Sequence, residues 1–132
     1  CLSLGCYGHV LLRLLRILPI RNEAWTDEAA FAAVTGVDFE HDVVLAEWSS
    51  GLFRPGHVVV VDHTSASVVV AVRGSSSVHD ALTDVVCAHA DFECGFGVGH
   101  AHEGMLTAAR RLLDTLRPLL IKTLAKYPGY AL

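Results

Sequence analysis

A loop rich in serine and glycine is the first place in this sequence where chemistry could occur. Arg73-Gly74-Ser75 follows directly on a valine-rich run that is predicted to be a buried strand. In open α/β sheets ligands collect at the carboxyl ends of strands, and this loop lies at such an end. Glycine allows close approach of the backbone, and a serine hydroxyl can donate a hydrogen bond to a developing oxyanion. The alternative is a plain turn of small residues, and the loop alone does not separate the two.

Cysteines and histidines in a glycine-containing stretch form a second group of candidates. They are Cys87, His89, Cys94, His100 and His102. Such side chains can ligate zinc, but the six-residue gap between the cysteines is wider than the usual spacing in zinc sites. Zinc is therefore the less favoured interpretation, and we predict neither a metal nor a cofactor. The remaining histidines, among them His57, His63 and His79, are interpreted as loop residues rather than ligands.

The serine-containing loop must be positioned by the strands before it. His57–Asp62 contains four consecutive valines, and Ser67–Val72 is a second run of β-favouring and small apolar residues. His63-Thr64-Ser65 separates the runs, so together they predict a β-hairpin. Because both runs are nearly continuous in apolar residues, we expect strands that are buried on both faces.

Helices are predicted before the hairpin. Cys1–Ile20 carries leucines at helical spacing and is interpreted as a helix. Thr26, followed by two acidic residues, predicts the start of another helix, and Gly36 predicts its end. Asp38–Trp48 is interpreted as a third helix, with its apolar residues on one side.

The elements after the loop complete the predicted order. Val78–Val86 is predicted to be a short helix, and Cys87–His102 an irregular segment. Glu103–Lys126 has the longest helical pattern, in which Pro118 is expected to cause a kink. Tyr130-Ala131-Leu132 is interpreted as the first part of a new strand. Helices, a hairpin, a crossover helix and a further strand predict an α/β fold.

The residues around the loop resemble the class 3 lipases, the fungal-type triacylglycerol lipases. Arg73-Gly74-Ser75 begins the similarity, and Asp80–Asp84 is most similar to the sn-1-specific diacylglycerol lipase branch. His100–Met105 resembles the His-x-Gly-hydrophobic motif that precedes the family's long helix. Tyr127–Leu132 is similar to the lead into the family's nucleophile strand. The resemblance covers roughly residues 40–132 and implies an α/β-hydrolase fold.

The resemblance also implies roles for individual residues. Ser75 matches the family's oxyanion-hole position, and Asp84 matches the aspartate that orients the hydroxyl at that position. Four further motif residues are expected to be structural: Arg73, Gly74, His102 and Gly104. Arg73 in particular is expected to be a buried partner of other groups, and His102 is expected beside the strand that carries the nucleophile.

The family's Gly-His-Ser-Leu-Gly elbow is expected a few residues beyond Leu132, with the acid and the histidine after it. None of the three is in this sequence, so we interpret the chain as an incomplete, N-terminal part of an α/β-hydrolase fold. Residues 1–39 are expected to form an N-terminal helical segment and residues 40–132 part of the lipase domain. The resemblance implies a parent protein that hydrolyses diacylglycerol or a related glycerolipid with a serine nucleophile. The alternative is a non-catalytic, truncated interaction module.

Composition and charge restrict the partners. With 52% hydrophobic and 18% charged residues the chain can bury a core, and its net charge of −4 argues against non-specific nucleic-acid binding. Arg13 and Arg16 on the first predicted helix leave contact with anionic lipid open. No apolar stretch is long enough to cross a bilayer, and the first residues lack the pattern of a signal peptide. A lipid surface is the expected partner, and the expected location is membrane-associated or cytoplasmic.

Overall fold

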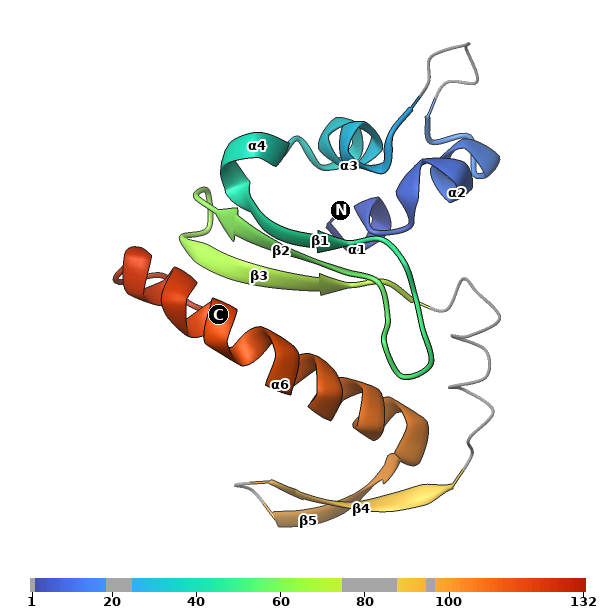
Figure 1. The fold of residues 1–132 in the computed structure, drawn as a ribbon, viewed down its shortest axis with the longest axis vertical. Coiled ribbons are helices and arrows are strands. Elements are labelled where there is room, and N and C mark those ends of the chain that lie inside the picture. Colours follow the sequence, from blue (N-terminus) through green and yellow to red (C-terminus); the bar gives the residue numbers. More distant parts are fainter. Residues whose placement is uncertain (1, 19–24, 75–87, 95–96) are drawn as a thin grey trace.

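A three-stranded sheet lies between a group of short helices and one long helix. The structure is a computed structural model that describes residues 2–18, 25–74, 88–94 and 97–132. In Figure 1 the short helices cover one face of the sheet, the long helix α6 covers the other, and a two-stranded ribbon lies at one end of α6. The molecule therefore mixes helices and strands, which is compatible with part of an α/β fold.

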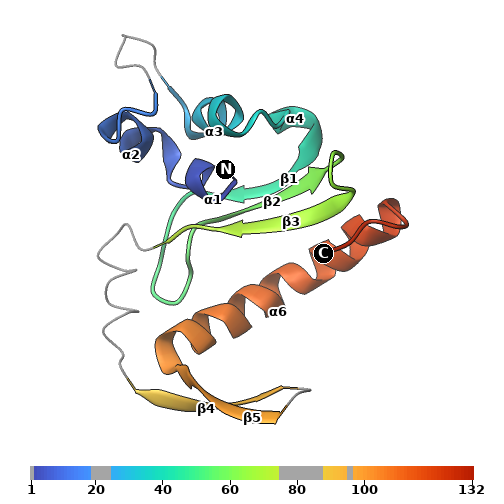
Figure 2. The ribbon, with the colours of Figure 1, turned by 180° about the vertical axis from the view of Figure 1, so that it is seen from behind.

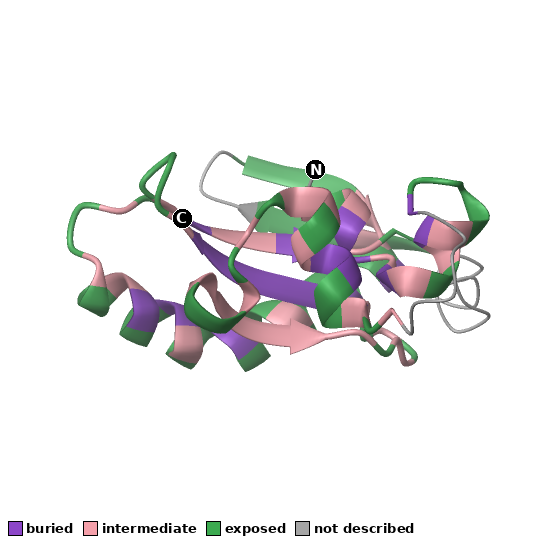
Figure 3. Cartoon of the chain, turned by 90° about the horizontal axis from the view of Figure 1, so that it is seen from above, coloured by how far each residue is buried: buried purple, intermediate pink, exposed green. Residues whose placement is uncertain are grey.

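The predicted hairpin is confirmed. Strand β2 (His57–Asp62) pairs antiparallel with β3 (Ser67–Val72), and five of the six residues of β2 are buried. Val58 and Val60 contact the core on the short-helix side, whereas Val59 packs against α6. Burial is concentrated along this central strand (Figure 3). The continuous valines of β2 thus reflect a strand that is covered on both faces. The same expectation is wrong for β3, in which only Val68 and Ala71 are buried, because β3 lies at the edge of the described sheet.

The predicted helix over Asp38–Trp48 is wrong. A single turn, α4 (Phe39–Asp42), is capped by the Asp38 side chain, and strand β1 (Val43–Glu47) follows at once. Strand β1 pairs antiparallel with β2, which gives the sheet order β1-β2-β3. The apolar residues of this segment fit either a helix or a strand, and pairing with the valine strand decides between them because it satisfies the backbone groups of both strands.

Short helices replace the single helix expected over Cys1–Ile20. They are α1 (Leu2–Gly5) and α2 (Gly8–Leu14), separated at Gly8, whose φ of 72° lies in the left-handed region. Helix α3 (Asp27–Thr35) lies where Thr26 and Gly36 predicted the second helix. The Thr26 hydroxyl accepts a hydrogen bond from the Ala29 amide at 3.2 Å, and Gly36 ends the helix with φ of 74°.

The N-terminal helices and the hairpin share one core. Phe31 of α3 is fully buried against Val58 and Val60, and its ring makes edge-to-face contacts with Phe39 and Trp48. Cys6 lies in the same core, and burial raises the pKa of its thiol to about 11. Residues from both sides of the expected boundary, 1–39 and 40–132, pack in this one core. The division into two segments stays a prediction.

The long helix is confirmed over the predicted range. Helix α6 (Glu103–Lys126) continues through Pro118 and packs Leu116 and Leu120 against the sheet. Beyond it Ala131 forms a parallel bridge with Ser67 at the start of β3, and its backbone carbonyl accepts from the Val68 amide at 2.8 Å. The chain therefore leaves β3, crosses over through α6 and begins a new strand beside and parallel to β3, as the sequence predicts.

The segment predicted to be irregular contains a second hairpin. Strands β4 (His89–Cys94) and β5 (Gly97–His102) pair antiparallel and lie beside the first turns of α6 (Figure 2). The strands are short, mostly exposed and polar, so they lack the apolar alternation by which a strand is recognised.

Among the residues that the structure describes, no helix is both long and apolar enough to span a membrane.

Candidate active site

The carboxyl end of β3 carries a fixed arginine. The Arg73 backbone amide donates to the Gly56 carbonyl at 2.8 Å, which extends the ladder between the two strands of the hairpin. Its guanidinium donates to the Trp48 carbonyl at 2.9 Å and to the Ser50 hydroxyl. Arg73 is half-buried and joins β3 to the loop that connects β1 and β2, so these contacts support a structural role and hold the start of the serine loop.

Gly74 leaves little room for a side chain at this point. A Cβ atom at Gly74 would lie 2.5 Å from the Tyr7 hydroxyl. At Gly56, opposite, a Cβ would lie 3.2 Å from the Glu47 carbonyl oxygen, a tight contact with backbone. The chain thus enters the serine loop beside Tyr7 and the β1–β2 loop, and a side chain at either glycine would require its neighbour to shift.

The two residues expected to do chemistry, Ser75 and Asp84, lie outside the described residues, as does the helix expected over Val78–Val86. Their roles stay predictions. What the structure does define is where the loop starts, since the strand ends at Val72 and the next residue, Arg73, is hydrogen-bonded to Gly56 and Trp48. The loop therefore starts at the carboxyl end of a buried strand, the location expected for a ligand site in an α/β sheet.

His102 and Gly104 lie at the junction between β5 and α6. The His102 ring Nδ1 accepts a hydrogen bond from the Met105 amide at 3.3 Å, which makes His102 the N-cap of the long helix. Gly104 is buried in the first helical turn. The histidine of this motif therefore stabilises the start of the crossover helix, a contact that the sequence did not indicate.

A cluster of aromatic residues holds the start of the new strand. The rings of Tyr127 and Tyr130 stack at a centroid distance of 5.3 Å, and the Tyr130 hydroxyl lies 2.8 Å from His63 Nδ1. The other ring nitrogen of His63 lies 3.5 Å from an Asp42 carboxylate oxygen. The sequence analysis did not predict this cluster of Tyr127, Tyr130, His63 and Asp42. The signal that could have indicated it is the Tyr-Pro-Gly-Tyr sequence, which places two aromatic rings on one turn. The cluster fixes Ala131 beside β3.

An apolar groove of about 570 Å³ runs between β3 and α6. Its lining is mostly valine and leucine: Val68, Val69, Val70, Leu112, Leu113, Leu116, Leu120 and Leu132, with Ser67 and Ala109. The groove follows the edge of β3 on which Ala131 makes its parallel bridge. Apolar side chains line the groove on both β3 and α6, so it can take up further apolar side chains.

The candidate zinc ligands do not come together in the part of the chain that the structure describes. His89 and His102 face each other at one end of the β4–β5 ribbon, whereas Cys94 lies at the opposite end, against Gly97. His100 lies with its Nδ1 at 3.1 Å from an Asp91 carboxylate oxygen. Cys87 lies outside the described residues. No group of three potential metal ligands occurs among the residues that were described.

Arg73→Met is expected to lower the free energy of unfolding by about 2 kcal/mol, because a hydrogen bond that involves a charged group contributes about 1.5–3 kcal/mol and the guanidinium binds Trp48 and Ser50. Arg73→Lys is expected to recover only part of this, since one ammonium cannot reproduce the planar fork. Urea unfolding measures both. Arg110→Met, at an exposed position of α6, is the matched control and should change little. Equal values for Arg73→Met and Arg110→Met would rule out the anchoring role.

Comparisons with known proteins agree with the resemblance found in the sequence. Residues 69–132 match the model of the lipase (class 3) family. Diacylglycerol lipase-beta of Mus musculus is 34% identical to this chain over 84 residues, which are 62% of the chain and 12% of that protein. The chain thus spans only a small part of the length of this curated relative. No solved structure matches it.

Proposed function

We propose that this chain, which resembles the class 3 lipases and among them diacylglycerol lipase-beta, is the N-terminal part of a serine ester hydrolase. The enzyme would act on diacylglycerol or a related glycerolipid. The observation that carries the proposal is the parallel bridge between Ala131 and Ser67. Because parallel strands end at the same edge of a sheet, a strand that starts at Ala131 leads to the edge where Arg73 and the serine loop begin.

The register of this bridge agrees with the expected position of the nucleophile. Val72 lies five residues after Ser67 in β3. A strand that keeps this register from Ala131 reaches the level of Val72 about five residues on, since parallel strands advance by nearly equal steps. That is where the family resemblance expects the Gly-x-Ser-x-Gly elbow. The apolar groove beside β3 supports such a continuation, because it offers valine and leucine side chains to a buried strand.

The chemistry would be acyl transfer. The nucleophilic serine oxygen attacks the ester carbonyl, and its proton passes to the histidine base. The alcohol leaves with that proton, and water then hydrolyses the acyl-enzyme. The contribution of this chain would be the oxyanion side of the site, with Ser75 as a donor and Asp84 as its orienting partner. The reaction needs no cofactor.

A serine-directed fluorophosphonate probe tests the proposal. The protein that carries this chain should be labelled on one serine in a Gly-x-Ser-x-Gly sequence, and labelling should abolish release of fatty acid from diacylglycerol vesicles. Triacylglycerol and a phospholipid with the same acyl chains serve as the comparison substrates. Absence of labelling together with absence of esterase activity would instead support a non-catalytic module, and activity on the phospholipid alone would exclude diacylglycerol as the substrate.

Helix α2 and the turn after it support contact with a lipid surface. Val10, Leu14, Leu15 and Ile17 have exposed fractions of 70%, 75%, 54% and 42%, and Arg13 and Arg16 lie between them. Apolar side chains beside basic ones are the pattern of a segment that inserts into the interface of an anionic membrane. A lipid surface is also where a glycerolipid substrate resides, so we propose that this segment contacts it.

The double variant Leu14→Gln, Leu15→Gln is expected to bind anionic vesicles more weakly, by about tenfold or more. The reason is that burial of each leucine side chain in the membrane interface contributes about 1.5–3 kcal/mol to binding. Flotation with vesicles measures the bound fraction. Ile121→Gln is the matched control, since Ile121 is 63% exposed on α6, far from α2 in the chain. Equal binding of the double variant and the control would refute contact through α2.

A further inference from the structure

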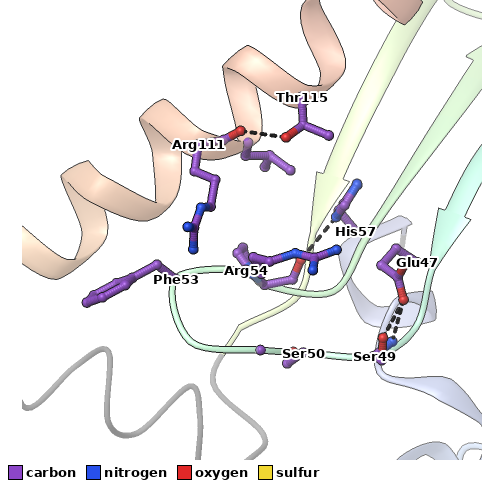
Figure 4. A pocket seen from close by; sticks show the side chains of 11 residues that line it. Glu47, Ser49, Ser50, Phe53, Arg54, His57, Arg111 and Thr115 are labelled. Atoms are coloured by element: carbon purple, nitrogen blue, oxygen red, sulfur yellow. Dashed lines mark hydrogen bonds between the residues drawn. The ribbon is translucent and has the colours of Figure 1, made fainter.

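A small pocket lies between the β1–β2 loop and α6 (Figure 4). Its volume is about 180 Å³, which suits a ligand group of a few heavy atoms rather than an acyl chain. The lining is rich in hydrogen-bonding and charged side chains: Glu47, Ser49, Ser50, Arg54, His57, Arg111 and Thr115, with Gly51, Phe53, Pro55 and Leu112. The lining polarity distinguishes this pocket from the apolar groove beside β3.

His57 presents an unpartnered nitrogen at this pocket. The residue is only 8% exposed, and its Nδ1 lies 3.0 Å from the Pro55 carbonyl oxygen. Because a carbonyl oxygen can only accept, Nδ1 is the nitrogen that donates here. Nε2 is buried and has no hydrogen-bond partner within the described protein. A buried polar nitrogen without a partner costs about 1–3 kcal/mol, so Nε2 favours a ligand that forms a hydrogen bond with it, and that bond needs one proton, carried by either atom.

Two guanidinium groups make the pocket attractive to an anion. Arg111 extends from α6 toward the β1–β2 loop and donates to the Leu52 carbonyl at 3.3 Å, and Arg54 lies on the loop itself (Figure 4). Glu47 is the acidic residue in the lining, and hydrogen bonds from the Ser49 amide and hydroxyl lower the pKa of its carboxyl group. With Glu47 ionised, the two arginines leave one net positive charge on these three side chains.

We propose that this pocket binds a phosphomonoester group. Its anionic oxygens match the guanidinium groups of Arg54 and Arg111. Its second pKa is about 6, so near neutral pH it exchanges a proton readily and can share one with His57 Nε2 in a hydrogen bond. Sulfate, phosphodiesters and carboxylates give up their last proton at much lower pH and cannot supply one. Two cations beside a buried imidazole nitrogen therefore favour a phosphomonoester over these anions.

The source of the group is either a soluble phosphate ester or the headgroup of a phosphomonoester lipid, and one experiment separates them. Binding to the full chain is measured by calorimetry with inorganic phosphate and glycerol 3-phosphate, and by flotation with vesicles that contain phosphatidic acid. Sulfate and phosphatidylglycerol vesicles are the matched ligands without the proton. Binding of the soluble esters identifies a soluble ligand, and binding of phosphatidic acid vesicles alone identifies a lipid headgroup. No binding in either arm overturns the proposal.

Variants test the residues without relying on hydrolase activity. Arg54→Ala and Arg111→Ala are each expected to weaken phosphomonoester binding by about tenfold or more, whereas Arg110→Ala, one position away on the same helix and outside the pocket, should stay within about twofold. His57→Phe is expected to remove the preference for phosphate over sulfate, with circular dichroism to check folding. Equal binding of phosphate and sulfate by the unaltered chain, or equal loss in the Arg110 control, overturns the assignment. Failure of these tests would leave the proposed hydrolase function untouched.

Discussion

Replacing Ser75 by alanine in the protein that carries this chain is expected to lower kcat by about 10²–10³-fold, the usual cost of losing one oxyanion donor. Acyl transfer places negative charge on the former carbonyl oxygen, and the Ser75 hydroxyl would donate to it. Because that charge exists only in the transition state, the loss should fall on kcat and leave KM nearly unchanged. Steady-state hydrolysis of a diacylglycerol or a short-chain ester measures both constants.

Three further variants assign the effect to the hydroxyl. Ser75→Thr should keep most of the activity, since the hydroxyl remains. Asp84→Asn should give an intermediate loss if Asp84 only orients that hydroxyl. Ser76→Ala, the neighbouring serine, is the matched control and should be nearly silent. If Ser76→Ala is crippling while Ser75→Ala is close to the unaltered enzyme, the oxyanion donor lies elsewhere in the loop.

The 132-residue chain alone is expected to hydrolyse no ester above a denatured control, because it contains no Gly-x-Ser-x-Gly sequence. In subtilisin, loss of the triad serine or histidine costs on the order of 10⁶ in kcat, so the deficit should be close to complete. A nitrophenyl ester and a fluorophosphonate probe provide the measurement. The longer protein, assayed at the same concentration, is the control.

Turnover by the isolated chain that the fluorophosphonate abolishes would contradict this prediction, because it would place a reactive serine within residues 1–132. Such a result would also remove the argument built on the register of Ala131. An inert chain beside an inert longer protein would favour a non-catalytic module, and an inert chain beside an active longer protein supports the hydrolase proposal.

Local signals in the sequence were sufficient for the elements with strong periodicity or caps. The consecutive valines predicted the hairpin, the leucine spacing predicted α6 over Glu103–Lys126, and Thr26 and Gly36 marked the ends of α3. Each of these signals acts within one element, through side-chain burial or a capping hydrogen bond between near neighbours. The parallel strand after α6 was also predictable, because a crossover helix returns the chain to the same sheet.

Elements whose state depends on a partner could not be predicted in this way. Val43–Glu47 is a strand because β2 lies beside it, and its own residues fit a helix as well. The β4–β5 ribbon has too few apolar residues for a pattern, so its pairing appears only when the two strands meet. Local preference is weak for both segments, and the backbone hydrogen bonds of the paired state decide their conformation.

The sequence by itself determined the type of chemistry to look for, through the Arg-Gly-Ser loop after a valine strand and its resemblance to the class 3 lipases. Tertiary structure alone decided which groups surround that loop. Arg73 is held by Trp48 and Ser50, more than twenty residues away in the chain, and His57 meets Arg111 at a pocket between a strand and the crossover helix. Hydrogen bonds and charge interactions act over a few ångströms whatever the separation in sequence, so only the folded chain defines these neighbours.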